Sequence, residues 1–235
     1  MKTSDIMISA LKVLGYGESG SGKTLFGSTF PRPSYYFDTD DGMLSLKGLE
    51  DIEYDTYEDI DLSNPKGAVA VEAKLKELHK ECPYKAVVFD SITTLADLAM
   101  NRILHLNGRA SGVPQQQDWL QQMTWLKNLI LRGKALPCHV YFTAHEQIIQ
   151  DEATMQVKCL PLITGKLAGK LPLYFDEVYH METTIKDKET VYRLLTKNNG
   201  KYLAKSRLNS KFNYFDTYEP QDFKLLEAKI KQKGV

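Results

Sequence analysis

Near its N-terminus the sequence holds a run of residues whose types and spacing suit phosphate binding. The run fits the pattern G-x-x-x-x-G-K-S/T and reads Gly17-Glu18-Ser19-Gly20-Ser21-Gly22-Lys23-Thr24. Glycines allow the tight turn that points successive backbone N–H groups at phosphate oxygens where a helix begins. Lys23 would reach the β and γ phosphates, and the Thr24 hydroxyl would bind magnesium. With Leu25 directly after it, the run predicts a site for ATP and Mg²⁺; the alternative is a glycine-rich surface turn.

A carboxylate later in the chain could supply the second half of such a site. The apolar segment 85–90 ends in Asp90, which can hold magnesium through water. An aspartate at the end of a strand also commonly caps the next turn. The phosphate-binding pattern earlier in the chain favours the metal-binding interpretation.

Hydrolysis also requires a group that activates or orients the attacking water. Such a group is best placed at the end of a strand that lies beside the strand leading into the phosphate-binding run, or P-loop. Segment 37–42 places Asp38, Asp40 and Asp41 in such a position. Crowded carboxylates raise one another's pKa, which would suit a base, yet a solvated turn would have the same composition. His145 follows the apolar segment 138–144, where it is either a sensor of the γ-phosphate or a histidine satisfied at the end of a strand.

These residues need strands and helices to position them, and the hydrophobic periodicity predicts both. We expect strands at 11–16, 34–38, 85–90 and 138–144, and helices at 23–30, 68–81, 94–106 and 118–131. Farther on we expect strands at 177–184, 190–196 and 202–205, then a helix at 223–230. This order predicts an α/β fold, one domain over residues 1–235, with a mostly parallel sheet flanked by helices and a C-terminal antiparallel extension.

The overall composition limits the environment and the partners. Lys plus Arg balances Asp plus Glu at 30 each, so no overall field draws the protein to nucleic acid or membrane, although acids gather at 31–61 and bases at 158–211. Cys82, Cys138 and Cys159 are odd in number and lack C-x-x-C spacing, which argues for a reducing compartment and against a disulfide frame or a zinc site. No stretch approaches the roughly 18 apolar residues of a membrane helix. We expect a cytoplasmic protein without a membrane partner.

Taken in order, several segments resemble the phage RecA-like single-strand annealing proteins, which have a RecA-type P-loop NTPase core. The resemblance spans about 11–208 and rests on 17–24, 37–42, 87–92, 142–145, 162–167 and 204–207. It implies Lys23 and Thr24 on phosphate and magnesium, Asp90 on magnesium, and Asp40 as the carboxylate that activates water. The family usually has glutamate there. With the shorter Asp40, either the water sits closer, or Asp41 shares the role, or hydrolysis is slow.

Lys205 and Arg207 resemble the element that RecA-like hexameric helicases insert into a neighbour's active site; the alternative is a solvated strand end. An arginine supplied in trans contributes roughly 10³ to 10⁵ in rate. The resemblance therefore implies self-assembly, as a ring or a filament, with ATP at the subunit interface and activity that depends on assembly.

The resemblance also implies loops that face DNA, at 107–117 and 147–169. These loops carry Arg109, Lys158, Lys166 and Lys170. A surface that binds the backbone of a single nucleic-acid strand needs basic groups of this kind. A stacking aromatic would help; Trp119 lies just beyond the first loop, but Trp119 and Trp125 share an amphipathic helix, so we expect at least one in the core.

The function implied is a Mg-dependent, DNA-stimulated ATPase that assembles on single-stranded DNA and promotes phage recombination or annealing in the host cytoplasm, with a single-strand-binding protein as a further partner. A nucleotide-gated loader or adaptor in a replication complex is one alternative. A P-loop small-molecule kinase is another, but it would need an arginine-rich lid, and the arginines here are scattered.

Overall fold

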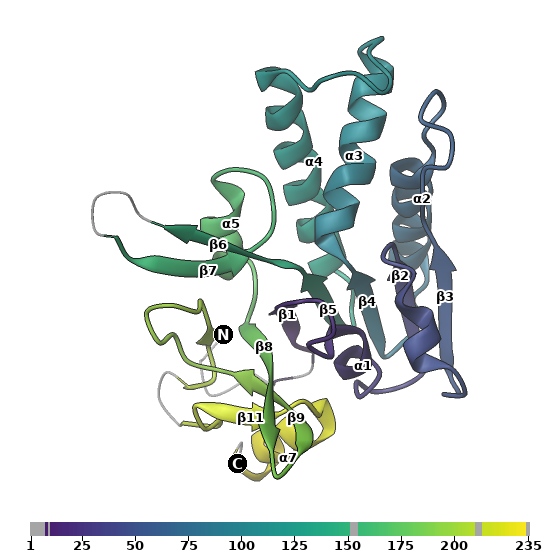
Figure 1. Ribbon diagram of the computed structural model, residues 1–235. Helices are drawn as coiled ribbons and strands as arrows, with labels where there is room; N and C mark the ends of the chain where they lie inside the picture. Colours follow the sequence, from purple (N-terminus) through teal and green to yellow (C-terminus); the bar gives the residue numbers. More distant parts are fainter. Residues whose placement is uncertain (1–7, 9, 151–154, 210–212, 234–235) are drawn as a thin grey trace, which may run out of the picture.

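The computed structural model describes residue 8 and residues 10–150, 155–209 and 213–233 (Figure 1). Among these residues, nine strands form a central sheet, and helices cover both of its faces. The predicted α/β fold class, with its mostly parallel sheet and antiparallel extension, is confirmed. The prediction of a single domain over 1–235 stays a prediction.

The parallel part of the sheet contains strands that the apolar segments predicted, together with one edge strand that they did not predict. Its order is β8 (Glu177–Lys186), β1 (Lys12–Tyr16), β5 (His139–Ala144), β4 (Ala86–Asp90), β2 (Ser34–Asp38) and β3 (Ile52–Thr56). Strands β2 and β4 are buried at every residue, as expected where helices cover both faces of a parallel sheet. Their carboxyl ends therefore meet at one edge.

One expectation about strand order was wrong. We expected segment 34–38 beside the P-loop strand, but β1 is flanked by β5 and β8, and both β5 and β4 lie between β1 and β2. An apolar strand is equally well buried at any interior position of the sheet, so its composition does not specify its neighbours. The loop after β2 still reaches the P-loop, because a 3-10 helix at Gly42–Leu46 folds back against α1 (Lys23–Gly27).

The antiparallel extension follows β8. Strand β9 (Glu189–Leu195) pairs with β8 through a tight turn at Asp187 and Lys188, β11 (Tyr218–Pro220) pairs with β9, and β10 (Lys205–Ser206) pairs with β8. Strand β10 thus shares only Lys205 with the strand predicted at 202–205. A separate hairpin of β6 (Glu146–Gln150) and β7 (Val157–Pro161), not predicted, projects from the sheet in Figure 1.

The larger core lies between the sheet and the helices α2 (Gly67–Lys80), α3 (Ile92–Leu106) and α4 (Gln116–Lys134). In it Phe37, Phe89 and Phe142 stand level on β2, β4 and β5 and stack in succession, each pair with ring centroids 4.4 Å apart. Offset aromatic contacts of this kind add to the burial energy. This ladder holds in register the strands whose ends carry the polar residues.

The opposite face is covered by α1 and by α7 (Phe223–Lys233). Phe223 stacks on Phe30, just beyond α1, with centroids 3.7 Å apart. The C-terminal segment is therefore packed against the helix that begins at the P-loop. A short α5 (Leu167–Lys170), continued by a 3-10 turn at Leu171–Leu173, precedes β8. Within the described ranges, no helix is long and apolar enough to cross a membrane.

Candidate nucleotide site

The P-loop has the strand–loop–helix context that its pattern requires. The chain leaves β1 at Tyr16, and α1 begins at Lys23. Gly20 and Gly22 have φ values of 78° and 90°, a region that glycine adopts without steric cost. Both glycines line a cavity of about 950 Å³, large enough for a nucleotide. The backbone at the start of α1 is thus open to an anion.

Lys23 points along the P-loop and is 7% exposed. Its Nζ donates to the carbonyls of Gly17, at 3.0 Å, and Glu18, at 2.7 Å. Burial lowers the pKa of Lys23 below its ordinary value, although Asp90 and Asp40 favour the charge. A buried ammonium that donates to neutral carbonyls can exchange them for phosphate oxygens, which carry negative charge.

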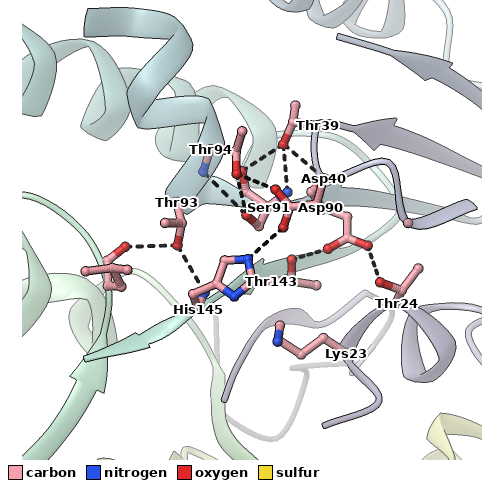
Figure 2. A network of polar contacts seen from close by, with 12 residues as sticks. Lys23, Thr24, Thr39, Asp40, Asp90, Ser91, Thr93, Thr94, Thr143 and His145 are labelled. Carbon is pink, nitrogen blue, oxygen red and sulfur yellow. Dashed lines mark hydrogen bonds and ion pairs between the residues drawn. The ribbon is translucent and has the colours of Figure 1, made fainter. Parts of the chain in front are cut away.

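Thr24 and Asp90 both line the cavity, and Figure 2 shows their side chains in contact. Thr24 Oγ1 donates to Asp90 Oδ2 at 2.6 Å, and Thr143 on β5 donates to the other carboxylate oxygen. Burial raises the pKa of Asp90, which is 1% exposed. A hydroxyl and a carboxylate side by side offer the hard oxygen ligands that magnesium prefers. The two residues therefore fit the predicted Mg²⁺ site.

Asp40 and His145 form the second polar group at this edge (Figure 2). Asp40 Oδ2 lies 3.0 Å from Nε2 of His145, and Asp40 Oδ1 accepts from the Thr94 hydroxyl at the start of α3. Burial would raise the pKa of Asp40, but hydrogen bonds from His145 and Thr94 outweigh it, so the pKa is lowered. The expected rise from crowding with other carboxylates is therefore wrong for Asp40.

The neighbouring carboxylates behave differently. Asp38 is fully buried, and burial raises its pKa; it accepts from the backbone N–H of Gly42 at 3.0 Å, which holds the turn after β2. Asp41 is exposed and lines the cavity, and within the described residues no hydrogen bond to its carboxylate is found. Of the three, Asp40 alone joins the polar group with His145.

Sequence reasoning missed two residues near the P-loop, Tyr192 at the cavity and Gln221 beside Ser21. The ring of Tyr192 on β9 is 41% exposed and lines the cavity. Gln221, just before α7, donates to the carbonyl of Ser21 at 2.9 Å and to that of Arg193 at 3.2 Å. A Cβ at Gly22 would lie 2.4 Å from the Gln221 side chain, so these residues fit closely against the P-loop. Nothing local in the sequence marks either residue.

Lys205 and Arg207 lie at the opposite end of the sheet from their own P-loop. Lys205 pairs with Val178, near the start of β8, and β8 begins level with Val13 of β1. The P-loop follows the other end of β1. One chain does not bring Lys205 or Arg207 to its own nucleotide site, so a role in hydrolysis would require a second chain.

Both of these basic side chains have partners nearby. Lys205 Nζ donates to the carbonyl of Pro172 at 2.6 Å, and Arg207 donates to Asp176 at 2.8 Å and to the carbonyl of Leu173 at 3.1 Å. The Arg207 side chain is 51% exposed. It forms an ion pair at the surface, within reach of a neighbouring molecule.

The residues predicted to contact DNA fall into two groups. Arg109, in the loop between α3 and α4, donates at 2.7 Å to Asp118, a buried carboxylate that also accepts from the Gln115 N–H. Its guanidinium therefore helps to cap α4. The lysines are exposed: Lys158 lies on β7, Lys166 directly precedes α5, and Lys170 is the last residue of α5.

The two tryptophans of α4 differ as expected. Trp125 is partly buried against the core, and its indole N–H donates to Glu72 at 2.6 Å. Trp119 is 40% exposed and stands beside the loop that precedes α4. An aromatic surface is thus available next to the first predicted DNA loop.

Comparisons with known proteins relate this chain to one protein family and to a solved structure. The model of the family described as AAA domain matches residues 9–208, a stretch that begins before β1 and ends after β10. Among solved structures, the chain is similar to a KaiC-like protein from the hyperthermophilic archaeon Pyrococcus horikoshii OT3, with 15% sequence identity and a TM-score of 0.41, over 79% of this chain and 77% of that one. A search of curated proteins found no match.

Proposed function

We propose that this chain, which belongs to the AAA domain family, binds ATP with magnesium and hydrolyses it while assembled on single-stranded DNA. As a member of that family it is a P-loop ATPase. The observation that carries the proposal is that two polar pairs, Thr24 with Asp90 and Asp40 with His145, line the same cavity. The first pair suits a metal-bound triphosphate, and the second suits a water molecule beside it.

The triphosphate would lie along the P-loop. Lys23 would release the carbonyls of Gly17 and Glu18 and bind phosphate oxygens instead. Hydrogen bonds from an ammonium to a charged phosphate are stronger than those to a neutral carbonyl. Thr24 and Asp90 would hold the magnesium, which when bound supplies positive charge to polarise the phosphoryl oxygens. The exposed ring of Tyr192 on the rim would offer a stacking face to the nucleobase.

Asp40 would position the attacking water. Its carboxylate is oriented by Thr94 and His145 before any nucleotide arrives, and its lowered pKa keeps it ionised at neutral pH. An ionised carboxylate accepts a hydrogen bond from water and so aligns its lone pair toward the γ-phosphate. His145 would then sense whether the γ-phosphate is present, through its contact with Asp40.

Assembly would complete the site. Arg207 is exposed and lies at the opposite end of the sheet from the P-loop, so chains stacked head to tail would bring Arg207 of one to the phosphates of the next. A guanidinium there would stabilise the charge that develops in the transition state. A ring and a filament both meet this requirement, since each uses a heterologous interface.

Single-stranded DNA would bind near the β6–β7 hairpin. His145 is the residue directly before β6, and Lys158 is exposed on β7, so a change at the γ-phosphate has a short covalent path to a basic surface. Lys166 and Lys170, at the two ends of α5, would extend that surface. Binding that responds to the nucleotide would serve recombination or annealing of phage DNA.

The experiment that tests this function measures ATP turnover across protein concentration, with and without a single-stranded oligonucleotide. Turnover per chain should rise with protein concentration and rise again with DNA. A turnover rate per chain that does not change with protein concentration would contradict assembly. A rate that does not change when DNA is added would contradict the DNA-binding role alone. No magnesium-dependent turnover under any of these conditions would contradict the whole proposal.

A further inference from the structure

A second cluster of polar side chains lies beside the P-loop, apart from the group around Asp40. Glu146 begins β6, Cys159 lies on β7 and His180 lies on β8. Their potential ligand atoms all lie within 4.8 Å of one another, and Nε2 of His180 is 2.9 Å from Glu146 Oε2. We propose that these three side chains hold one zinc ion.

The set of donor atoms indicates which metal would bind. Zinc takes thiolate, imidazole and carboxylate ligands, at bonds of about 2.0 to 2.3 Å, in tetrahedral sites. Magnesium prefers oxygen alone, so the ion that accompanies ATP would not choose this cluster. A thiolate and a carboxylate carry two negative charges, which zinc balances. The lack of C-x-x-C spacing in the sequence disfavours a zinc site built from two or more cysteines. It does not bear on a site with a single cysteine ligand.

Packing already fixes the orientation of the ligands. Cys159 is fully buried, and His180 is 3% exposed. The His180 ring stacks on Tyr202, with centroids 3.9 Å apart, and meets Tyr16 edge-on at 5.2 Å. Its Nδ1 is buried and, in the part of the chain that the structure describes, has no partner. Side chains immobilised in this way lose little entropy on binding a metal.

One coordination position would stay open. Glu146 and His180 also line a cavity of about 210 Å³, together with Glu18 and Ser19 of the P-loop. This cavity has room for a water molecule, the usual fourth ligand when a protein supplies three. The ion would tie the base of the β6–β7 hairpin to β8, next to the P-loop. The hairpin that carries Lys158 would thus be anchored by a metal.

The test is a titration of the metal-free full-length chain with cobalt(II), followed by displacement with zinc(II). One cobalt per chain should bind and give thiolate-to-cobalt charge-transfer absorption in the near ultraviolet. Cys159→Ser should lose that absorption, and Glu146→Gln should weaken cobalt binding by more than about tenfold. Cys82→Ser is the matched control, because the Cys82 thiol lies 3.8 Å from that of Cys138 and belongs to no group of three possible metal ligands among the described residues. That variant should bind as the wild type does.

Far-ultraviolet circular dichroism would check that each variant is folded. If Cys159→Ser fails to fold, Glu146→Gln carries the test, because the Glu146 side chain is 12% exposed and its amide keeps the shape of the carboxylate. Cobalt absorption that is absent in the wild type, unchanged in Glu146→Gln, or lost in Cys82→Ser would overturn the proposal.

Discussion

Oδ2 of Asp40 lies 3.0 Å from Nε2 of His145, although the two residues follow different strands of the sheet. Thr94 binds the other oxygen of the same carboxylate. The ends of β2 and β5 and the start of α3 are therefore connected through one side chain. This connection gives Asp40 a fixed orientation, whereas the neighbouring Asp41 has an exposed side chain.

Lys23→Met should stabilise the nucleotide-free protein and remove its response to ATP. Burial lowers the pKa of Lys23, so the charged form opposes folding at every pH below its folded pKa. This cost fades as the pH rises toward the ordinary value of 10.5, so the gain from the substitution should shrink there. Wild type should gain about 2.7 kcal/mol when ATP is present at about 100 times its Kd.

Thermal melting across pH, with and without ATP, measures both effects of Lys23→Met. A variant that melts lower than wild type without nucleotide would contradict the electrostatic argument. A variant that keeps the ATP-induced rise in Tm would contradict the assignment of Lys23 to the phosphates.

Arg207→Ala should lower ATP turnover by about 10³-fold or more while leaving ATP binding intact. Its ion pair with Asp176 is exposed, so the free energy of unfolding should change by no more than about 1 kcal/mol. Mixing this variant with Lys23→Ala should restore part of the turnover, because the second chain supplies Arg207 to the intact P-loop of the first. Arg132→Ala, at the end of α4, is the control. Full turnover by purified Arg207→Ala would rule out the role in trans.

Gln221→Ala should weaken ATP binding about two- to tenfold, the effect of losing a net hydrogen bond of about 0.5 to 1.5 kcal/mol. Gln221 supports the P-loop through the carbonyl of Ser21 and does not reach the polar group around Asp40, so kcat at saturating ATP should hold. Calorimetric titration compares it with Gln117→Ala, an exposed glutamine on α4. Equal affinities for the two variants would show that this support is unimportant.

Substitution of Lys158, Lys166 or Lys170 by alanine should weaken binding of single-stranded DNA at all sequences alike. Each lost phosphate contact should flatten the slope of log K against log salt by about 0.7. Arg109→Ala should act differently, because it removes a partner of the buried Asp118 and so lowers the stability of the fold. Fluorescence anisotropy at several salt concentrations separates the two effects. Unchanged slopes in all three lysine variants would remove the hairpin and α5 from the DNA surface.

The sequence predicted most elements, because each buried strand and amphipathic helix leaves a local pattern. It did not predict strand β3, which is largely exposed at the sheet edge and needs no apolar run. The sequence also does not determine the order of the strands in the sheet. For this reason the expected position of the strand before Asp40, next to β1, was wrong. Tyr192 and Gln221 reach the P-loop through packing of the C-terminal segment, and such long-range contacts have no local pattern.

Single-turnover hydrolysis of ATP by Asp40→Asn measures whether Asp40 positions the attacking water. The amide keeps the size of the side chain but loses the negative charge, so hydrolysis should slow by at least about 10²-fold while ATP binding persists. Asp40→Glu, which retains a carboxylate, should keep measurable turnover. Hydrolysis by Asp40→Asn at the wild-type rate would show that the Asp40 carboxylate does not position the attacking water.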